Sequence, residues 1–132
     1  MKLDQRSIAA IKEYIAAAPD KKSLTGIGGI YWKALVDEIM YAVGSLPNVR
    51  IWPRYVGYDD RAKISYGIVG EPDLEGIISP LGRMLCIEVK TGDAVLSKKQ
   101  KIRRAMLEKF GALYIEARSV EQVLEIILAN LP

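Results

Sequence analysis

The chain has 132 residues, a length that suits one folded domain of ordinary size. Half of the residues are hydrophobic and 27% are charged, a balance typical of globular proteins and not of disordered ones. No apolar run approaches the roughly 20 residues that a membrane-spanning helix needs. Charges also interrupt the apolar residues of the N-terminus, so neither a membrane anchor nor a secretory signal is expected.

Two residue types are scarce, and their scarcity narrows the possible chemistry. The single cysteine, Cys86, excludes an internal disulfide, and the chain has no histidine. Together these features favour a reducing, cytoplasmic setting. The absence of histidine excludes Ser-His-Asp and Cys-His catalysis and every zinc site that needs imidazole. Any metal would be a hard ion held by oxygen atoms, such as Mg²⁺ or Mn²⁺.

The first third of the chain is expected to be helical. Residues 4–18 carry isoleucines at helical spacing and stop before Pro19, and a polar loop with three glycines follows. A second helix is predicted from about Ile30 to Val43, because its apolar residues fall on one face. These patterns predict an N-terminal helix-and-loop extension, residues 1–29, attached to a domain at residues 30–132 within one compact unit.

Strand-forming patterns begin at Val49. Turn residues separate four such segments, which predict a meander: VRIWPRYVGY, AKISYGIV, DLEGIIS and RMLCIEVKT. A helix is expected from Lys98 to Phe110, with Ser97 as its N-cap and Gly111 at its end. ALYIEA predicts a further strand, and a final helix follows a capping serine. The order predicts a mixed α/β domain with a parallel pairing at the last strand–helix–strand step.

Three charged residues, Asp73, Glu88 and Lys90, stand among the strand-forming residues of the segment GEPDLEGIISPLGRMLCIEVKTG. Glu88 and Lys90 are two residues apart, so in a strand they project from the same face. If the strand that starts at Asp73 pairs with the next strand through the PLG turn, Asp73 lies near Glu88. Two carboxylates and an ammonium at one end of a sheet suit a divalent ion and its waters. This geometry favours hydrolysis of a phosphodiester.

The other charges have more ordinary interpretations. Glu71 and Glu75 are assigned to solvent, and Trp32 to the core or an interface. Residues 98–109, KKQKIRRAMLEK, contain six basic residues and one acid. Such a run is commonly a solvated helix face, but phosphate contact is favoured here because the run abuts the proposed site.

Pro72-Asp73 followed by Glu88-Val89-Lys90 resembles the PD-(D/E)XK nuclease signature. The surrounding segments resemble the VRR-NUC family of that superfamily, from about Val49 to Leu128: VRIWPRYVG, GEPDLEGIISPLGR, IEVKTG, LSKKQ and GALYIEARSVEQVL. The resemblance implies a restriction-endonuclease-like core, in which helices flank a mixed central sheet, with the N-terminal helix as an addition. It also implies a small phage-type homodimer that uses Mg²⁺ or Mn²⁺ to cut branched DNA, such as four-way junctions, in a bacterial or phage-infected cell.

The resemblance assigns roles to the matching positions. Asp73 and Glu88 would be metal ligands together with the backbone carbonyl of Val89, Lys90 would be the catalytic lysine, and Gln100 would support the active site. The family's acid on the first helix of the core corresponds to Asp37 or Glu38, with Glu38 favoured as the catalytic residue. Contacts with DNA are expected from five basic residues: Arg54, Lys98, Lys99, Lys101 and Arg104.

Two alternatives stay open. A catalytically silent DNA-binding module could keep the same fold, although the intact Asp73, Glu88 and Lys90 argue against it. The chain could also be a nuclease subunit that cuts only with a partner.

Overall fold

The computed structural model describes residues 28–54 and 57–132, so the helix predicted over residues 4–18 lies outside the described residues. Three helices are described: α2 (Gly28–Gly44), α3 (Lys98–Lys109) and α4 (Val120–Ala129). They confirm the three helices predicted after residue 29. No helix in the described ranges has both the length and the apolar character needed to cross a membrane.

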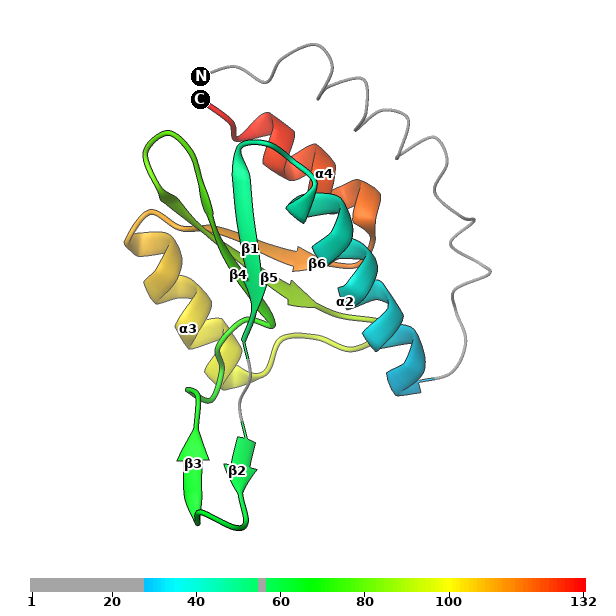
Figure 1. Ribbon diagram of the computed structural model, residues 1–132, viewed down its shortest axis with the longest axis vertical. Coiled ribbons are helices and arrows are strands. Elements are labelled where there is room, and N and C mark those ends of the chain that lie inside the picture. The colour runs from blue at the N-terminus through cyan, green and yellow to red at the C-terminus, as the bar shows by residue number, and fades with distance from the viewer. Residues whose placement is uncertain (1–27, 55–56) are drawn as a thin grey trace.

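A mixed four-stranded sheet forms the centre of the fold (Figure 1). Its strands, in spatial order, are β1 (Val49–Pro53), β4 (Leu74–Ile78), β5 (Arg83–Val89) and β6 (Leu113–Ala117). β4 runs antiparallel to both β1 and β5, while β6 runs parallel to β5. The parallel pairing confirms the prediction, because α3 carries the chain back between β5 and β6.

Different helices pack on the two faces of the sheet. Residues of α2 and α4 share one hydrophobic core with Ile87 and Val89 of β5. α3 covers the other face, where Leu107 packs in a smaller cluster with Cys86. Burial raises the pKa of Cys86 to about 12, which agrees with its predicted role as a small buried side chain. Because side chains alternate along a strand, Glu88 projects to the α3 face.

The capping signals explain where α3 begins and ends. The side chain of Ser97 accepts the backbone N–H of Gln100, and the side chain of Gln100 accepts the backbone N–H of Ser97. This reciprocal capping box satisfies two backbone donors that the first turn leaves unpaired. Gly111 has a φ of +98°, a conformation that glycine adopts without strain, so it ends the helix as predicted.

The predicted meander is wrong between β1 and β4. β2 (Gly57–Asp59) and β3 (Ile64–Tyr66) pair in a separate two-stranded sheet, and β1 pairs directly with β4. Their side chains are exposed at nearly every position, so these strands have no apolar face that a central sheet could bury. We call residues 57–70, which stand out from the body in Figure 1, the arm.

Candidate active site

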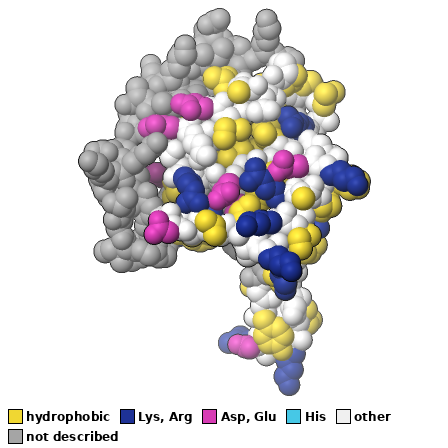
Figure 2. Space-filling model, turned by 180° about the vertical axis from the view of Figure 1, so that it is seen from behind, with side chains coloured by type: hydrophobic (Ala, Val, Ile, Leu, Met, Phe, Trp, Pro, Cys, Tyr) yellow, Lys and Arg dark blue, Asp and Glu magenta, His cyan; other side chains and the backbone are white. Residues whose placement is uncertain are grey.

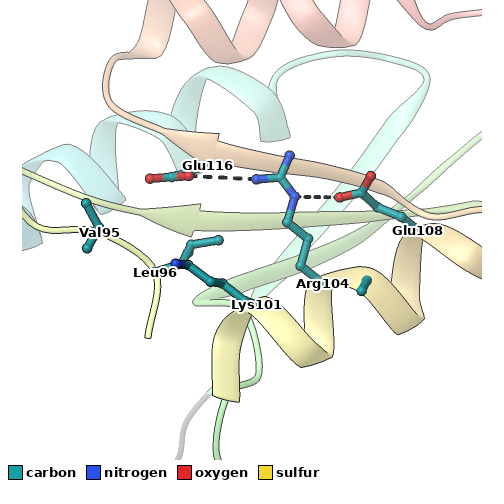
Figure 3. Close-up of a pocket in the computed structure, with 7 residues that line it drawn as sticks. Val95, Leu96, Lys101, Arg104, Glu108 and Glu116 are labelled. Atoms are coloured by element: carbon teal, nitrogen blue, oxygen red, sulfur yellow. Dashed lines mark hydrogen bonds and ion pairs between the residues drawn. The ribbon is translucent and has the colours of Figure 1, made fainter. Parts of the chain in front are cut away.

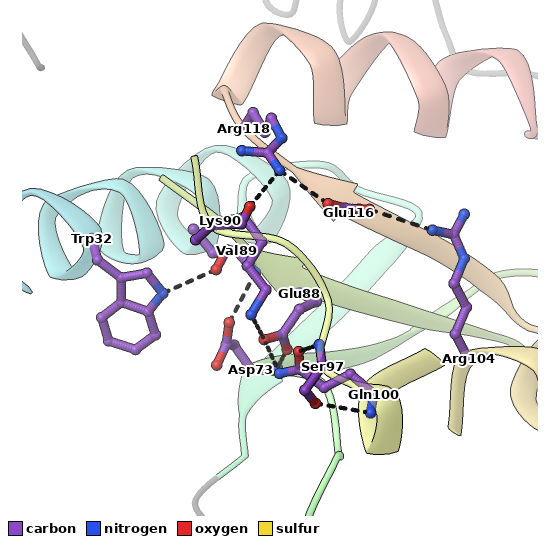
Figure 4. A network of polar contacts seen from close by, with 11 residues as sticks. Trp32, Asp73, Glu88, Val89, Lys90, Ser97, Gln100, Arg104, Glu116 and Arg118 are labelled. Carbon is purple, nitrogen blue, oxygen red and sulfur yellow. Dashed lines mark hydrogen bonds and ion pairs between the residues drawn. The ribbon is translucent and has the colours of Figure 1, made fainter. Parts of the chain in front are cut away.

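The candidate site lies where β4 begins and β5 ends. The antiparallel register pairs Leu74 with Ile87, which sets Asp73 beside Glu88. The backbone N–H of Asp73 donates a 3.1 Å hydrogen bond to Oε2 of Glu88 (Figure 4). The backbone N–H of Val89 in turn donates a 2.8 Å hydrogen bond to Oδ2 of Asp73. The structure thus brings the two carboxylates together, as strand pairing through the PLG turn requires.

Two further side chains converge on Glu88, whose own side chain is only 4% exposed. Nζ of Lys90 lies 3.3 Å from Oε1 of Glu88, and Nε2 of Gln100 donates a 2.7 Å hydrogen bond to the same oxygen. Oε1 of Gln100 is held at 2.8 Å by the backbone N–H of Ser97. The capping box that begins α3 therefore also directs an amide group at Glu88.

The carbonyl of Val89 is contacted from α2. Nε1 of Trp32 donates a 3.0 Å hydrogen bond to this oxygen, as Figure 4 shows. The N–H and C=O of one strand residue point to the same side, so this carbonyl faces the same way as the N–H bound to Asp73. The sequence analysis missed this role of Trp32, because the two partners are 57 residues apart and no local pattern links them.

The electrostatics of the site disfavour two ionised carboxylates. The pKa of Glu88 is raised to about 7, first by burial and then by the negative charge of Asp73, while Lys90 opposes both effects. Burial also raises the pKa of Asp73, against the lowering effects of the Val89 N–H and of Lys90. One lysine cannot balance two carboxylates, so a bound cation would stabilise the ionised form of the pair.

The donor atoms fit a hard divalent cation. They are the carboxylate oxygens of Asp73 and Glu88 and the carbonyl of Val89, which are the oxygen ligands that Mg²⁺ and Mn²⁺ prefer. The carbonyl has a second lone pair besides the one that Trp32 engages. Among residues 28–54 and 57–132, no group of three or more acidic, cysteine or histidine side chains could hold a metal. An ion here would therefore depend on two carboxylates, one carbonyl and water.

The acids of α2 lie apart from this cluster. Asp37 pairs with Lys33 at 2.7 Å, and both side chains are more than half exposed. Glu38 is half-buried, and none of the hydrogen bonds or ion pairs seen in the described ranges joins it to Asp73 or Glu88. Glu38 follows Trp32 by six residues, which places it about 240° around the helix. The α2 residue that contacts the site is Trp32, and the role expected for Glu38 stays a prediction.

The basic residues expected to contact DNA differ in their surroundings. Lys98, Lys99 and Lys101 are exposed in the first turn of α3, beside Gln100. Arg104, one turn further along, is engaged within the protein. Its charge is therefore less available to a phosphate than the charges of the three lysines.

Arg104 crosses an open pocket of about 580 Å³ between α3 and β6 (Figure 3). It bridges Glu108 on its own helix and Glu116 on β6, and its guanidinium lies 5.0 Å from the ring centroid of Tyr114. The remaining lining residues are Val95, Leu96, Lys101 and Ala105. Because two acids and a ring already hold Arg104, we interpret it as a link between α3 and the sheet.

A second acidic pair, Glu71 and Glu75, is buried on the α3 side of the sheet, so its assignment to solvent is wrong. Arg103 of α3 forms an ion pair with Glu71, and Nε of Arg54 lies 3.5 Å from Glu75. The pKa of Glu75 is raised to about 7, first by burial and then by a hydrogen bond with Glu71. Strand alternation could have revealed this burial, because Glu75 shares the face of Asp73. Arg54 thus pairs with a buried acid, and its expected contact with DNA stays a prediction.

Comparisons with protein-family models, with curated proteins and with solved structures give no match for this chain. The candidate site is therefore defined by its own geometry, in which two carboxylates, a carbonyl and a lysine meet at one end of a mixed sheet.

Proposed function

We propose that this chain is a metal-dependent DNA endonuclease of the PD-(D/E)XK type, similar to the VRR-NUC family. The observation that carries the proposal is the meeting of Asp73, Glu88 and Lys90 with the carbonyl of Val89 beside them. A mixed sheet with helices on both faces also agrees with what the resemblance implies. Motif spacing and side-chain geometry thus support the same assignment.

Asp73, Glu88 and the Val89 carbonyl would hold Mg²⁺ or Mn²⁺. When bound, such an ion polarises a phosphoryl oxygen and lowers the pKa of a water molecule. Lys90, at the edge of the cluster, orients the attacking water and offsets the negative charge that develops on the phosphate. Gln100 holds the Glu88 carboxylate in place. Water adds to phosphorus, the bond to the 3′ oxygen breaks, and a 5′-phosphate product results, as the resemblance implies.

We further propose branched DNA, such as four-way junctions, as the substrate and a homodimer as the working form. Both rest on the resemblance to the VRR-NUC family. A two-fold dimer would present two sites to two strands of a junction. The exposed Lys98, Lys99 and Lys101 support DNA as the substrate, because they supply positive charge beside Gln100 and Glu88.

The test is incubation of the purified chain with a labelled four-way junction and with a linear duplex of the same sequence. We expect cleavage in Mg²⁺ or Mn²⁺, none in EDTA, and none for Glu88→Ala, whose fold should stay intact by circular dichroism. Glu125→Ala, which removes an exposed acid of α4, is the matched control and should cut normally.

Two results would contradict a self-sufficient nuclease. Binding of both DNAs without cleavage by either ion would favour the catalytically silent binding module. Cleavage that depends on an added second protein would favour a subunit of a larger assembly, and a monomer in sedimentation experiments would weaken the proposed homodimer.

A further inference from the structure

The arm carries a large amount of exposed apolar surface for its size. Five large hydrophobic side chains along it are about half exposed or more: Tyr58, Ile64, Tyr66, Ile68 and Val69. The arm also stands clear of the body, as Figures 1 and 2 show. A two-stranded hairpin is marginally stable by itself in water, and neighbouring exposed apolar side chains mark contact surfaces. This surface therefore suits contact with another molecule.

The arm is joined directly to the candidate site. Arg54 precedes it, Asp73 follows it, and the backbone N–H of Arg54 donates a 2.8 Å hydrogen bond to the carbonyl of Asp73. At its base, Gly70 packs closely against α3, since a Cβ added there would lie 3.0 Å from the carbonyl oxygen of Lys99. A molecule bound at Asp73 would consequently lie next to both the arm and the first turn of α3.

The arm carries two cations and two acids at its tip, and three further cations lie at its base. Figure 2 shows Lys and Arg side chains at the tip. The two acids near the tip are Asp59 and Asp60, and Asp59 also stabilises the turn, because its Oδ1 accepts the backbone N–H groups of Arg61 and Ala62. The exposed cations at tip and base are Arg61, Lys63, Lys98, Lys99 and Lys101. Cations therefore outnumber exposed acids here, which complements a polyanion.

We propose that the arm binds duplex DNA by entering the groove beside the phosphodiester that lies at Asp73. The major groove admits a two-stranded β-ribbon, so the width of the arm suits it. The apolar side chains would contact bases and sugars, while Arg61 and Lys63 contact phosphates. The inference rests on the proposed function in one respect, which is the placement of a phosphodiester at Asp73.

Two double variants of the full chain test the arm. The charge variant is Arg61→Gln with Lys63→Asn, since asparagine tolerates the φ of +54° at that position. The apolar variant is Tyr58→Ser with Ile64→Thr. The matched controls change residues at the end of the molecule opposite the arm. Arg50→Gln with Lys109→Gln controls for charge, and Leu81→Ser controls for exposed apolar surface. Circular dichroism and thermal unfolding establish that each variant keeps its fold.

Binding of a labelled duplex of about 30 base pairs is measured by fluorescence anisotropy in EDTA over a range of salt concentrations. We expect each arm variant to weaken binding about tenfold, while the controls bind like the wild type. The charge variant should also lower the log-log salt slope by about two, one for each basic side chain removed from a phosphate, and the apolar variant should leave it unchanged.

Wild-type affinity in both arm variants would overturn the proposal, and so would an absence of duplex binding by the wild type. Arm variants that change from dimer to monomer in sedimentation, yet bind duplex normally, would assign the arm to a second copy of the chain instead. The measurement needs no divalent ion. A chain that binds through the arm but never cuts in Mg²⁺ would therefore leave this inference standing and remove the proposed endonuclease activity.

Discussion

The indole N–H of Trp32 donates a 3.0 Å hydrogen bond to the carbonyl of Val89, the backbone oxygen between Glu88 and Lys90. α2 thus contacts the proposed metal site through a neutral donor, while the role expected for the acid Glu38 stays a prediction. One hydrogen bond fixes the direction of the carbonyl and leaves its second lone pair available to a cation. We therefore interpret Trp32 as a positioning residue of the proposed site.

Trp32→Phe keeps an aromatic ring but removes the N–H group. Contacts to metal ligands of this kind typically contribute 10- to 100-fold to metal affinity, so we expect Mn²⁺ to bind about tenfold more weakly or worse. Electron paramagnetic resonance of free Mn²⁺ measures the affinity. Trp52→Phe changes an exposed tryptophan of β1 that lies opposite Glu75 and, in the described ranges, forms no hydrogen bond with Asp73, Glu88 or Val89. This variant should bind Mn²⁺ like the wild type. Equal affinity in the two variants would leave Trp32 with a packing role only.

Gln100 links two functions, since it caps α3 through Oε1 and holds Glu88 through Nε2. Gln100→Glu keeps the cap but puts a carboxylate beside Glu88, which should raise the pKa of Glu88 further. We expect the pH at which Mn²⁺ begins to bind to rise by about one unit. Gln100→Ala should instead cost about 1 kcal/mol of folding stability, and the pH at which Mn²⁺ begins to bind should not rise. Mn²⁺ titrations at several pH values measure the effect on Glu88, and urea unfolding measures the effect on stability. The same pH dependence of Mn²⁺ binding in both variants would argue against the contact with Glu88.

The buried glutamates predict an unusual pH dependence of stability. Glu75 and Glu88 have folded-state pKa values of about 7, against an ordinary value of 4.5. Between these values the unfolded chain releases protons that the folded chain retains. The free energy of unfolding should therefore fall as pH rises from about 4.5 to 7, by up to about 3 kcal/mol for each group.

Urea unfolding in EDTA across this pH range measures that decline. Mg²⁺ should recover part of the loss near pH 7, because it binds the ionised form of Glu88. Glu88→Gln should reduce the decline, since only Glu75 and Asp73 then contribute. A stability that stays level or increases over the same range in EDTA would contradict the raised pKa values.

The exposed lysines of α3 offer a test that does not involve the arm. Replacing Lys98, Lys99 and Lys101 together by Gln should weaken DNA binding and flatten its salt dependence by about one log-log unit for each lysine that contacts a phosphate. Lys109→Gln, at the opposite end of the helix, serves as the control. An unaltered salt slope in the triple variant would mean that these three lysines form a solvated surface and do not contact phosphates.

Local signals predicted the elements that position the site. Ser97 and Gly111 act on their immediate neighbours, so the predicted end of α3 differs from the observed end by one residue. The meeting of Asp73 with Glu88 was also predictable, because a short turn sets the register and strand alternation sets the face.

Long-range packing explains what the sequence did not predict. The burial of Glu71 depends on Arg103, which contacts it only because α3 crosses that face of the sheet. The contact of Trp32 with Val89 likewise depends on how α2 lies against β5. The strand pattern of β3 was recognisable, whereas β1 and the start of β2 were predicted as one strand. A strand pattern does not specify its partner, so the separate arm was predicted as part of a meander.

The central claim is that the acid after Pro72 and the Glu88-Val89-Lys90 triplet share one divalent cation. Anomalous scattering from a crystal soaked in Mn²⁺ tests it directly, because the signal locates the ion independently of the protein chain. We predict one anomalous peak within coordination distance of Asp73, Glu88 and the Val89 carbonyl, absent from Glu88→Gln crystals. A site without any peak, or ions bound only elsewhere on the chain, would contradict the account.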